Sequence, residues 1–247
     1  MLKNNLLQIL KPFELLFFPK TCLVCGKNEN YICDACLGEV SYVLNYSCLV
    51  CQKPSLDGFI HLKCKNKFTP DRFLSAFEYK GVVKKALIGA KYRGKIFDTY
   101  NLLVGLAFEH FEEMDLNIGN KAIVIPIPVH FKKYIKRTFN HADIIAGIFA
   151  KNYGIKVVNA LKKVKETQTQ SLLKREERKK NVESVFKVNS RYLNDIKGKD
   201  IVLIDDIVTT GSTMLSACKA LRKLGNNGPR YIYCLSLAYD LPYIRFG

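Results

Sequence analysis

The sequence has no apolar run that approaches the roughly 20 residues a membrane-spanning helix needs, so we expect no membrane span. Its opening segment, residues 1–20, also lacks a long apolar core, because Lys11 and Pro12 interrupt it; we therefore expect no secretory signal. These absences favour a cytoplasmic protein. Leu and Phe recur at rough helical spacing over residues 2–18, which predicts either a helix docked on the protein body or one touching a membrane surface.

Acidic residues are scarce, with 22 Asp and Glu against 39 Lys and Arg in 247 residues, a formal net charge of +17. The imbalance is largest over residues 121–200, which hold 19 basic and 7 acidic residues. Such an excess favours a polyanionic partner such as nucleic acid, and a solvated basic surface is the simpler alternative. With 48% hydrophobic residues, a chain of this length can form a large core domain and a small additional one.

Cysteines are confined to residues 22–64 apart from Cys218 and Cys234, which occupy apolar positions typical of a core. In a reducing cytoplasm, clustered cysteines favour metal over disulfides. Three C-x₂-C pairs and one H-x₂-C pair occur, and two such pairs complete a tetrahedral zinc site. They predict one or two structural Zn²⁺ ions, with pairs combined sequentially or interleaved, and His61 is either a ligand or incidental. The candidate ligands are Cys22, Cys25, Cys33, Cys36, Cys48, Cys51, His61 and Cys64.

The stretch IVLIDDIVTTGST at residues 201–213 organises the rest of the chain. It predicts a buried strand over 201–204, an acidic turn, a hydroxyl-rich loop, and a helix over 214–224. A glycine and hydroxyls at a helix start suit a phosphate, whereas paired carboxylates suit sugar hydroxyls or Mg²⁺. Together they predict a ribose 5-phosphate site, the alternative being an N-capped helix after an ordinary Asp turn. Its residues are Asp205, Asp206, Thr209, Thr210, Gly211, Ser212 and Thr213.

Apolar runs elsewhere predict strands over 73–79, 122–127, 155–161, 185–188 and 231–237. Apolar residues at helical spacing predict helices over 82–90, 99–114 and 142–149. Pro70 marks a candidate boundary between residues 1–69, an N-terminal helix and zinc-binding module, and a core domain over 70–247. Residues 162–181 are intensely charged. They predict either a mobile arm, whose Lys165, Arg175 and Arg178 close over a ligand, or a solvated helix laced with ion pairs.

Two basic segments, residues 80–95 and 132–180, are candidates for contact with a nucleic-acid backbone, and Tyr92 in the first is suited to stacking on a base. The basic end of a helix interacting with the helix dipole is an equally simple explanation of the first segment. The candidate DNA-binding residues are Lys84, Lys85, Lys91, Arg93, Lys132, Lys133, Lys179 and Lys180.

Several of these motifs resemble one known family. The sequence D-D-x-x-T-T-G-x-T resembles the motif that binds phosphoribosyl pyrophosphate (PRPP) in type I phosphoribosyltransferases. Nearly the whole chain resembles the ComF/GntX group. The resemblance rests on this motif, the cysteine pairs, residues 79–81, 91–94, 126–130 and 137–142, and Thr167, Gln170, Arg175, Arg178 and Asn181. The chain departs from that family's usual R-G-F-N-Q at Thr138 and His141, and has His61 where a cysteine is usual.

The resemblance implies an α/β fold: a type I phosphoribosyltransferase-like core with a central parallel sheet, plus a small N-terminal zinc-binding module. It implies a PRPP site at Asp205 and Asp206, used with Mg²⁺, and a role in natural transformation that handles single-stranded DNA on the cytoplasmic side. A DNA-uptake helicase or other competence proteins are further candidate partners. The alternative is a conventional phosphoribosyltransferase of nucleotide metabolism, in which Asp205 and Asp206 are the catalytic candidates.

Overall fold

The computed structural model describes residues 20–28, 30–93, 96–114, 116, 118–119, 121–129, 140–164 and 185–240, without the side chains of 91–93 and 96. The helix expected over residues 2–18 lies outside this range. In the part of the chain that is described, no helix is both long and apolar enough to cross a membrane.

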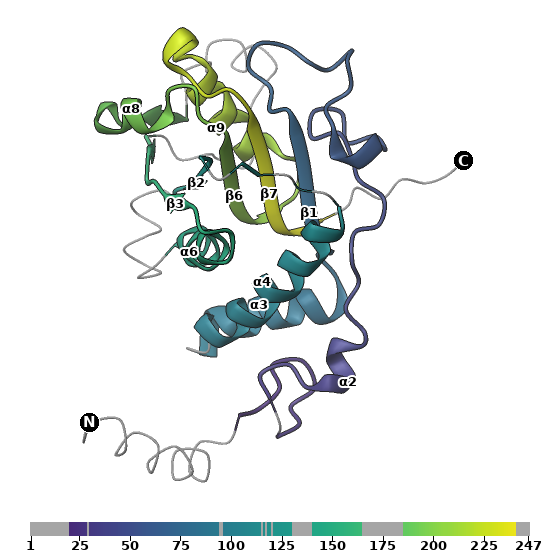
Figure 1. Ribbon diagram of the computed structural model, residues 1–247. Helices are drawn as coiled ribbons and strands as arrows, with labels where there is room; N and C mark the ends of the chain where they lie inside the picture. Colours follow the sequence, from purple (N-terminus) through teal and green to yellow (C-terminus); the bar gives the residue numbers. More distant parts are fainter. Residues whose placement is uncertain are drawn as a thin grey trace, which may run out of the picture.

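A parallel five-stranded sheet with strand order β1-β7-β6-β2-β3 forms the centre of the described chain (Figure 1). Its inner strands are almost wholly apolar, as expected when helices cover both faces of a parallel sheet. The predicted α/β fold with a central parallel sheet is thereby confirmed. The strands are β1 (Arg72–Glu78), β2 (Ile123–Pro126), β3 (Lys156–Val157), β6 (Ile201–Val208) and β7 (Ile232–Tyr239).

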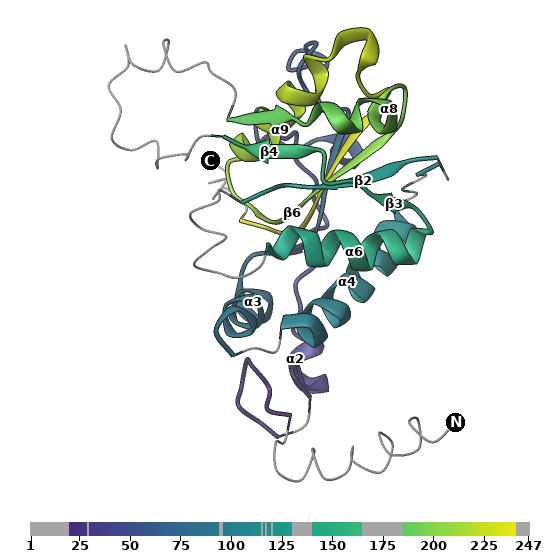
Figure 2. The same ribbon diagram turned by 90° about the vertical axis from the view of Figure 1, so that its left-hand side faces the viewer.

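Helices pack on both faces of this sheet (Figure 2). One face carries α3 (Gly81–Arg93), α4 (Ile96–Glu113) and α6 (His141–Tyr153), and the other carries α8 (Leu193–Ile196) and α9 (Ser212–Arg222). Short 3₁₀ turns complete the connections at Leu56–Gly58, Ser190–Tyr192 and Gly225–Asn227. The helices predicted over 82–90, 99–114, 142–149 and 214–224 are all present, each with somewhat different ends.

The strand order places a topological switch point between β2 and β6. These strands are neighbours, yet β2 leads to α6 on one face whereas β6 leads to α9 on the other (Figure 2). At such a switch point, open parallel sheets bind ligands outside the carboxyl ends of the strands. The motif at residues 201–213 runs from β6 into the start of α9 and so ends at this edge of the sheet.

Two predicted strands differ in the structure. The strand expected over 155–161 is divided into β3 and β4 (Leu161–Lys163), and β4 leaves the main sheet to pair antiparallel with β5 (Phe186–Val188). The acidic turn expected after Ile204 is instead strand, because β6 stays paired with β7 from Ile201 to Val208. Ile207 and Val208 are β-branched and favour this continuation.

The cysteine-rich segment runs along the outer edge of β1, and its short helix α2 (Asp34–Leu37) lies near α3 (Figure 1). The Val43 N–H donates to the Ala76 carbonyl and the Glu78 N–H to the Ser41 carbonyl, each at 2.9 Å. These bonds satisfy groups that an edge strand would leave unpaired. Buried residues of the segment, such as Ile32 and Leu49, belong to the same continuous core as the sheet.

The far end of α9 is held by an ion pair across the sheet edge. The Arg222 guanidinium lies 2.5 Å from the Asp71 carboxylate, and both side chains are largely buried. The same carboxylate accepts the Ile232 N–H at 2.9 Å, so α9 is tied to the start of β7. With the carboxyl end of α9 fixed, the position of the helix at the carboxyl edge of the sheet depends on what holds its amino end.

Candidate functional site

The loop between β6 and α9 places the amino end of the helix at the carboxyl edge of the sheet. Gly211 is the N-cap of α9, in the left-handed region with φ +71°, and its carbonyl accepts the Leu215 N–H at 2.9 Å. Unpaired N–H groups of a first helical turn attract anions. Gly211 has no side chain with which to cap α9, and the Ser212 N–H donates to Thr210 Oγ1 at 3.4 Å. Residues 205 and 207–214 line a cavity of about 40 Å³ here.

Asp205 and Asp206 stand at the carboxyl end of β6. The Asp206 N–H donates to Asp205 Oδ1 at 2.9 Å, and the Ile207 N–H donates to Asp206 Oδ1 at 2.8 Å. Because side chains alternate along a strand, the two carboxylates project toward opposite faces of the sheet. Each therefore keeps an oxygen held by the backbone while facing a different set of neighbours.

The electrostatic surroundings of the two carboxylates reflect this alternation. Burial, and then the negative charge of Asp206, raise the pKa of Asp205 well above its usual value, and Lys163 on β4 acts in the opposite direction. On the other side, burial and then Asp206 raise the pKa of Tyr79. A cation or a hydrogen-bond donor at the carboxylates would relieve the repulsion that raises the Asp205 pKa.

The remaining anion-binding candidates lie mostly outside the described residues. This applies to Lys165, Arg175 and Arg178, and to Lys132, Lys133, Lys179 and Lys180. The side chains of Lys91 and Arg93 are likewise outside the description, although their backbone belongs to α3. Lys84 and Lys85 are described and exposed on α3, where the Lys84 ammonium lies 5.5 Å from the centre of the Tyr79 ring.

The first cysteine group brings together Cys22, Cys25, Cys33 and Cys36, with all four sulfurs within 4.8 Å of one another. Cys22 Sγ lies 3.9 Å from Cys36 Sγ, and Cys25 Sγ lies 3.6 Å from Cys33 Sγ. Zinc–sulfur bonds of about 2.3 Å imply tetrahedron edges of about 3.8 Å, so the donor set and its spacing fit Zn²⁺. Burial opposes ionisation of Cys22, but backbone N–H bonds lower its pKa to about 6, which favours the thiolate.

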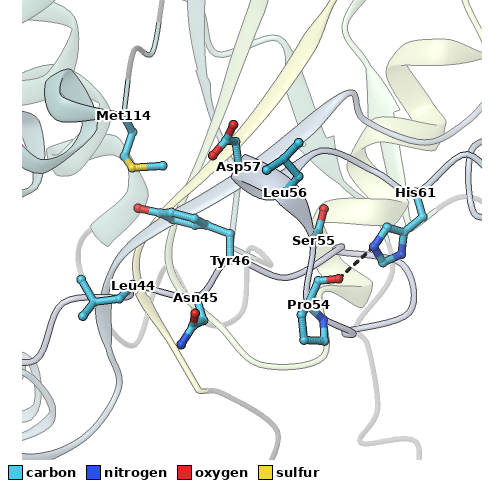
Figure 3. A pocket seen from close by; sticks show the side chains of 9 residues that line it. All are labelled: Leu44, Asn45, Tyr46, Pro54, Ser55, Leu56, Asp57, His61 and Met114. Atoms are coloured by element: carbon cyan, nitrogen blue, oxygen red, sulfur yellow. Dashed lines mark hydrogen bonds between the residues drawn. The ribbon is translucent and has the colours of Figure 1, made fainter.

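The second group brings together Cys48, Cys51, His61 and Cys64. His61 Nδ1 lies 3.3 Å from Cys51 Sγ, while His61 Nε2 donates to the Pro54 carbonyl at 2.9 Å (Figure 3). That second bond leaves Nδ1 as the lone-pair nitrogen, which is how metal-binding histidines are oriented. The structure thus groups the pairs sequentially and includes His61, two points that the spacing alone left open.

A larger cavity of about 500 Å³ is lined in part by His61 of the second group (Figure 3). Tyr46, Asp57, His61 and Met114 are among its lining residues, and none of residues 205–214 reaches it. The Tyr46 hydroxyl is already hydrogen-bonded to His110 Nε2 at 2.9 Å. The smaller cavity instead combines the Asp205 carboxylate, a strand end and a helix start, so we take it as the candidate site.

The second group touches the loop between β6 and α9 directly. The Gln52 side-chain amide donates to the Thr210 carbonyl at 3.1 Å, and Leu49 packs on Gly211. A Cβ on Gly211 would lie 2.5 Å from Leu49 Cδ1, so only glycine fits. Sequence analysis did not identify Leu49 or Gln52 as site residues, because they lie between and beside metal ligands and contact the loop only through the fold.

In comparison with known proteins, two families match separate parts of the chain. Residues 129–238 match the phosphoribosyl transferase domain family, and residues 14–66 match the double zinc ribbon domain family. The double zinc ribbon match and the two ligand groups together support structural zinc.

Relatives cover the chain to different extents. Competence protein F of Haemophilus influenzae is 33% identical over 103 residues, 41% of this chain and 44% of that protein. Competence protein ComFC of Bacillus subtilis is 23% identical over 219 residues, 81% of each chain. DNA utilization protein YhgH of Escherichia coli K12 is 25% identical over 113 residues, 45% of this chain and 48% of that protein. The chain thus spans less than half of the length of the first and third of these relatives.

Proposed function

Because the chain belongs to the ComF/ComFC-like family, we propose that it acts in DNA uptake by binding PRPP in the β6–α9 loop and single-stranded DNA on its basic surface. The relatives named for competence and DNA utilization support the role in DNA uptake. The observation that carries PRPP binding is the coincidence of the Asp205 and Asp206 carboxylates with a helix start at Gly211, at the switch point of a parallel sheet.

In this proposal, each part of the site recognises one part of PRPP. The N–H groups at the start of α9 and the hydroxyls of Thr209 to Thr213 hold the 5-phosphate, where the helix dipole favours negative charge. Asp205 and Asp206 accept hydrogen bonds from the ribose hydroxyls or hold Mg²⁺, which would screen the pyrophosphate charge. Lys165, Arg175 and Arg178 remain the candidates for closing over the pyrophosphate.

Single-stranded DNA binding rests on the net charge of +17 and on the exposed Lys84 and Lys85 of α3. One small PRPP site does not need so large an excess of positive charge, whereas a phosphate backbone does. A cytoplasmic location and a helicase or other competence protein as partner belong to the same proposal.

A conventional phosphoribosyltransferase is the second candidate, favoured by the domain match over residues 129–238. In that reaction, a nitrogen nucleophile bonds to C1 of PRPP as the C1–oxygen bond breaks and pyrophosphate leaves with the bonding electrons. The protein would position the reactants and stabilise separated charge.

One experiment separates the two candidates. Zinc-loaded protein is mixed with Mg²⁺ and PRPP, with and without nucleobases and single-stranded DNA, and both PRPP binding and released pyrophosphate are measured. Binding without release supports the DNA-uptake protein, and release with one nucleobase supports the transferase. Absence of PRPP binding in the zinc-loaded protein would contradict both.

A further inference from the structure

The chain contains two nearly identical six-residue turns that differ at one position. Residues 22–27 read CLVCGK, here called the first knuckle, and residues 48–53 read CLVCQK, the second knuckle. Each contains a C-x₂-C pair that belongs to one of the two ligand groups. The single difference places Gly26 in the first knuckle and Gln52 in the second.

The two turns share their backbone as well as their sequence. In the first knuckle, the Gly26 N–H donates to the Cys22 carbonyl at 3.0 Å; in the second, the Gln52 N–H donates to the Cys48 carbonyl at 2.8 Å. The residue after the second cysteine has positive φ in both, +83° at Gly26 and +61° at Gln52. Glycine adopts this region freely, whereas a residue with a Cβ does so at a cost.

The positive φ of Gln52 therefore has a conformational cost that a contact of its side chain can offset. Strained residues of this kind concentrate where the surrounding structure uses them. Gln52 uses its side chain to donate to the Thr210 carbonyl at 3.1 Å. The first knuckle needs no such bond and keeps glycine, and a Cβ on Gly26 would meet nothing within 4 Å. Space therefore does not explain the difference between the two positions, but the contact with the loop does.

The bond from Gln52 fixes the orientation of one peptide group in the loop. The Thr210–Gly211 peptide is planar and trans, so its carbonyl and its N–H point in opposite directions. With the carbonyl held by Gln52, the Gly211 N–H is directed away from the second knuckle. Leu49, packed on Gly211, prevents the peptide from moving toward the knuckle.

We propose that Gln52 and Leu49 are positioning residues that set the geometry of the phosphate-binding loop, with the second metal group as their rigid base. This inference rests on the proposed function, because it assigns the loop to the 5-phosphate of PRPP. Zn²⁺ held by Cys48, Cys51, His61 and Cys64 would fix the turn, and the side chains of Gln52 and Leu49 contact Thr210 and Gly211 from that turn. The second knuckle is thus a part of the ligand site rather than a remote stabilising module.

The test exchanges the one residue that differs. Gln52→Gly restores the residue of the first knuckle and removes the bond to Thr210, and Gly26→Gln makes the reciprocal change as the matched control. Zinc content and melting temperature are measured for both variants. Titration calorimetry then gives the affinity for PRPP with Mg²⁺ and for ribose 5-phosphate, and hydrogen exchange without ligand follows the amides of residues 209–214.

We expect Gln52→Gly to keep both zinc ions and to bind either ligand about 2- to 10-fold more weakly, the effect of one neutral hydrogen bond. Its 209–214 amides should exchange faster than in the wild type, whereas Gly26→Gln should leave affinity and exchange unchanged. Leu49→Ala should act in the same direction as Gln52→Gly. A purely structural turn would instead tolerate Gln52→Gly, since glycine relieves the backbone.

Affinity and loop exchange that stay at the wild-type level in Gln52→Gly would overturn the inference and leave the proposed function standing. Failure of the wild type to bind PRPP would overturn the proposed function. The hydrogen-exchange comparison then tests by itself whether Gln52 positions the loop. Faster exchange in Gln52→Gly than in the wild type supports this role, and equal exchange contradicts it.

Discussion

The first and second knuckles have almost the same sequence but contact different parts of the core. Leu23 of the first lies against Gly89 on α3, and Leu49 of the second lies against Gly211 at the start of α9. Each leucine follows the first cysteine of its knuckle, and each meets a glycine. Each metal group is therefore attached to a helix of the phosphoribosyltransferase-like core through a turn of the same sequence type.

The difference lies in what each attached helix does in the proposed function. Helix α3 carries the exposed Lys84 and Lys85, candidates for DNA contact, whereas α9 begins the PRPP loop. The fit is also tighter at the second knuckle, because a Cβ would approach Leu49 to 2.5 Å at Gly211 but Leu23 only to 3.1 Å at Gly89. We therefore expect the first zinc group to affect DNA binding and the second to affect PRPP binding.

Removal of one metal group should have the largest effect. Cys48→Ala removes a ligand from the second group and Cys22→Ala one from the first, and structural zinc contributes on the order of 10 kcal/mol to the segment it holds. We expect each variant to lose about one zinc per chain. We expect Cys48→Ala to lose PRPP binding and Cys22→Ala to retain it. Metal analysis and PRPP titration measure both, and equal loss of PRPP binding in the two variants would contradict separate roles.

Adding one methyl group should have the next largest effect. Gly211→Ala combines positive φ with a clash against Leu49, and we expect it to lower the free energy of unfolding by about 2–4 kcal/mol. Gly89→Ala lies within a helix, where alanine is favoured by up to about 1 kcal/mol, so its mild crowding should nearly cancel. Chemical denaturation measures both, and similar losses would show that the two contacts are equivalent.

We expect Asp205→Asn to change stability and PRPP affinity in opposite directions. The pKa of Asp205 is raised in the folded protein, so the native state binds the extra proton and stability falls as pH rises above the unfolded value of about 3.9. The variant should therefore melt higher than the wild type at pH 7 and equally at acidic pH. Its PRPP affinity should fall at least tenfold, since hydrogen bonds to charged groups contribute about 1.5–3 kcal/mol.

Melting scans from pH 4 to pH 8 and PRPP titrations measure these two effects. A variant that melts lower than the wild type at pH 7 would show that the carboxylate has a stabilising partner in the folded protein. In that case Asp205 and its partner would have a structural role, and the PRPP site would have to lie elsewhere.

The smallest effect is expected at α3, on the side of the first knuckle. Replacing Lys84 and Lys85 with Gln should weaken single-stranded DNA binding a few-fold and reduce the salt slope by about 0.7 per lost phosphate contact. PRPP affinity should not change. The matched control replaces Lys187 and Lys197, exposed lysines outside α3, with Gln. Equal slopes in the two double variants would place the DNA on another surface.

The individual strands and helices were predictable because their periods are local, whereas the central parallel sheet was implied by the family resemblance. The strand at 201–204 and the helix after Thr213 followed from apolar runs and a glycine. The continuation of β6 through Asp205 to Val208 was missed, since it depends on the partner strand β7. The split between β3 and β4 was missed for the same reason: β4 pairs with β5, which lies more than twenty residues later in the chain.

The metal ligands were predictable because C-x₂-C spacing is itself the signal. Their grouping was not, because it depends on which pairs meet in space, and the structure settles it as sequential. The contacts of Leu49 and Gln52 with Gly211 and Thr210 join residues about 160 positions apart, so no local pattern reports them. A glutamine where the matching turn has glycine was the one available signal.

Hydrogen exchange of the zinc-loaded wild type, with and without Mg²⁺ and PRPP, tests the central claim most directly. The account predicts slower exchange of the amides of residues 209–214 when PRPP is present, and no such slowing when Asp205 and Asp206 are both replaced with Asn. Unchanged exchange in this loop at saturating PRPP, or slowing confined to other segments, would contradict the assignment of the site.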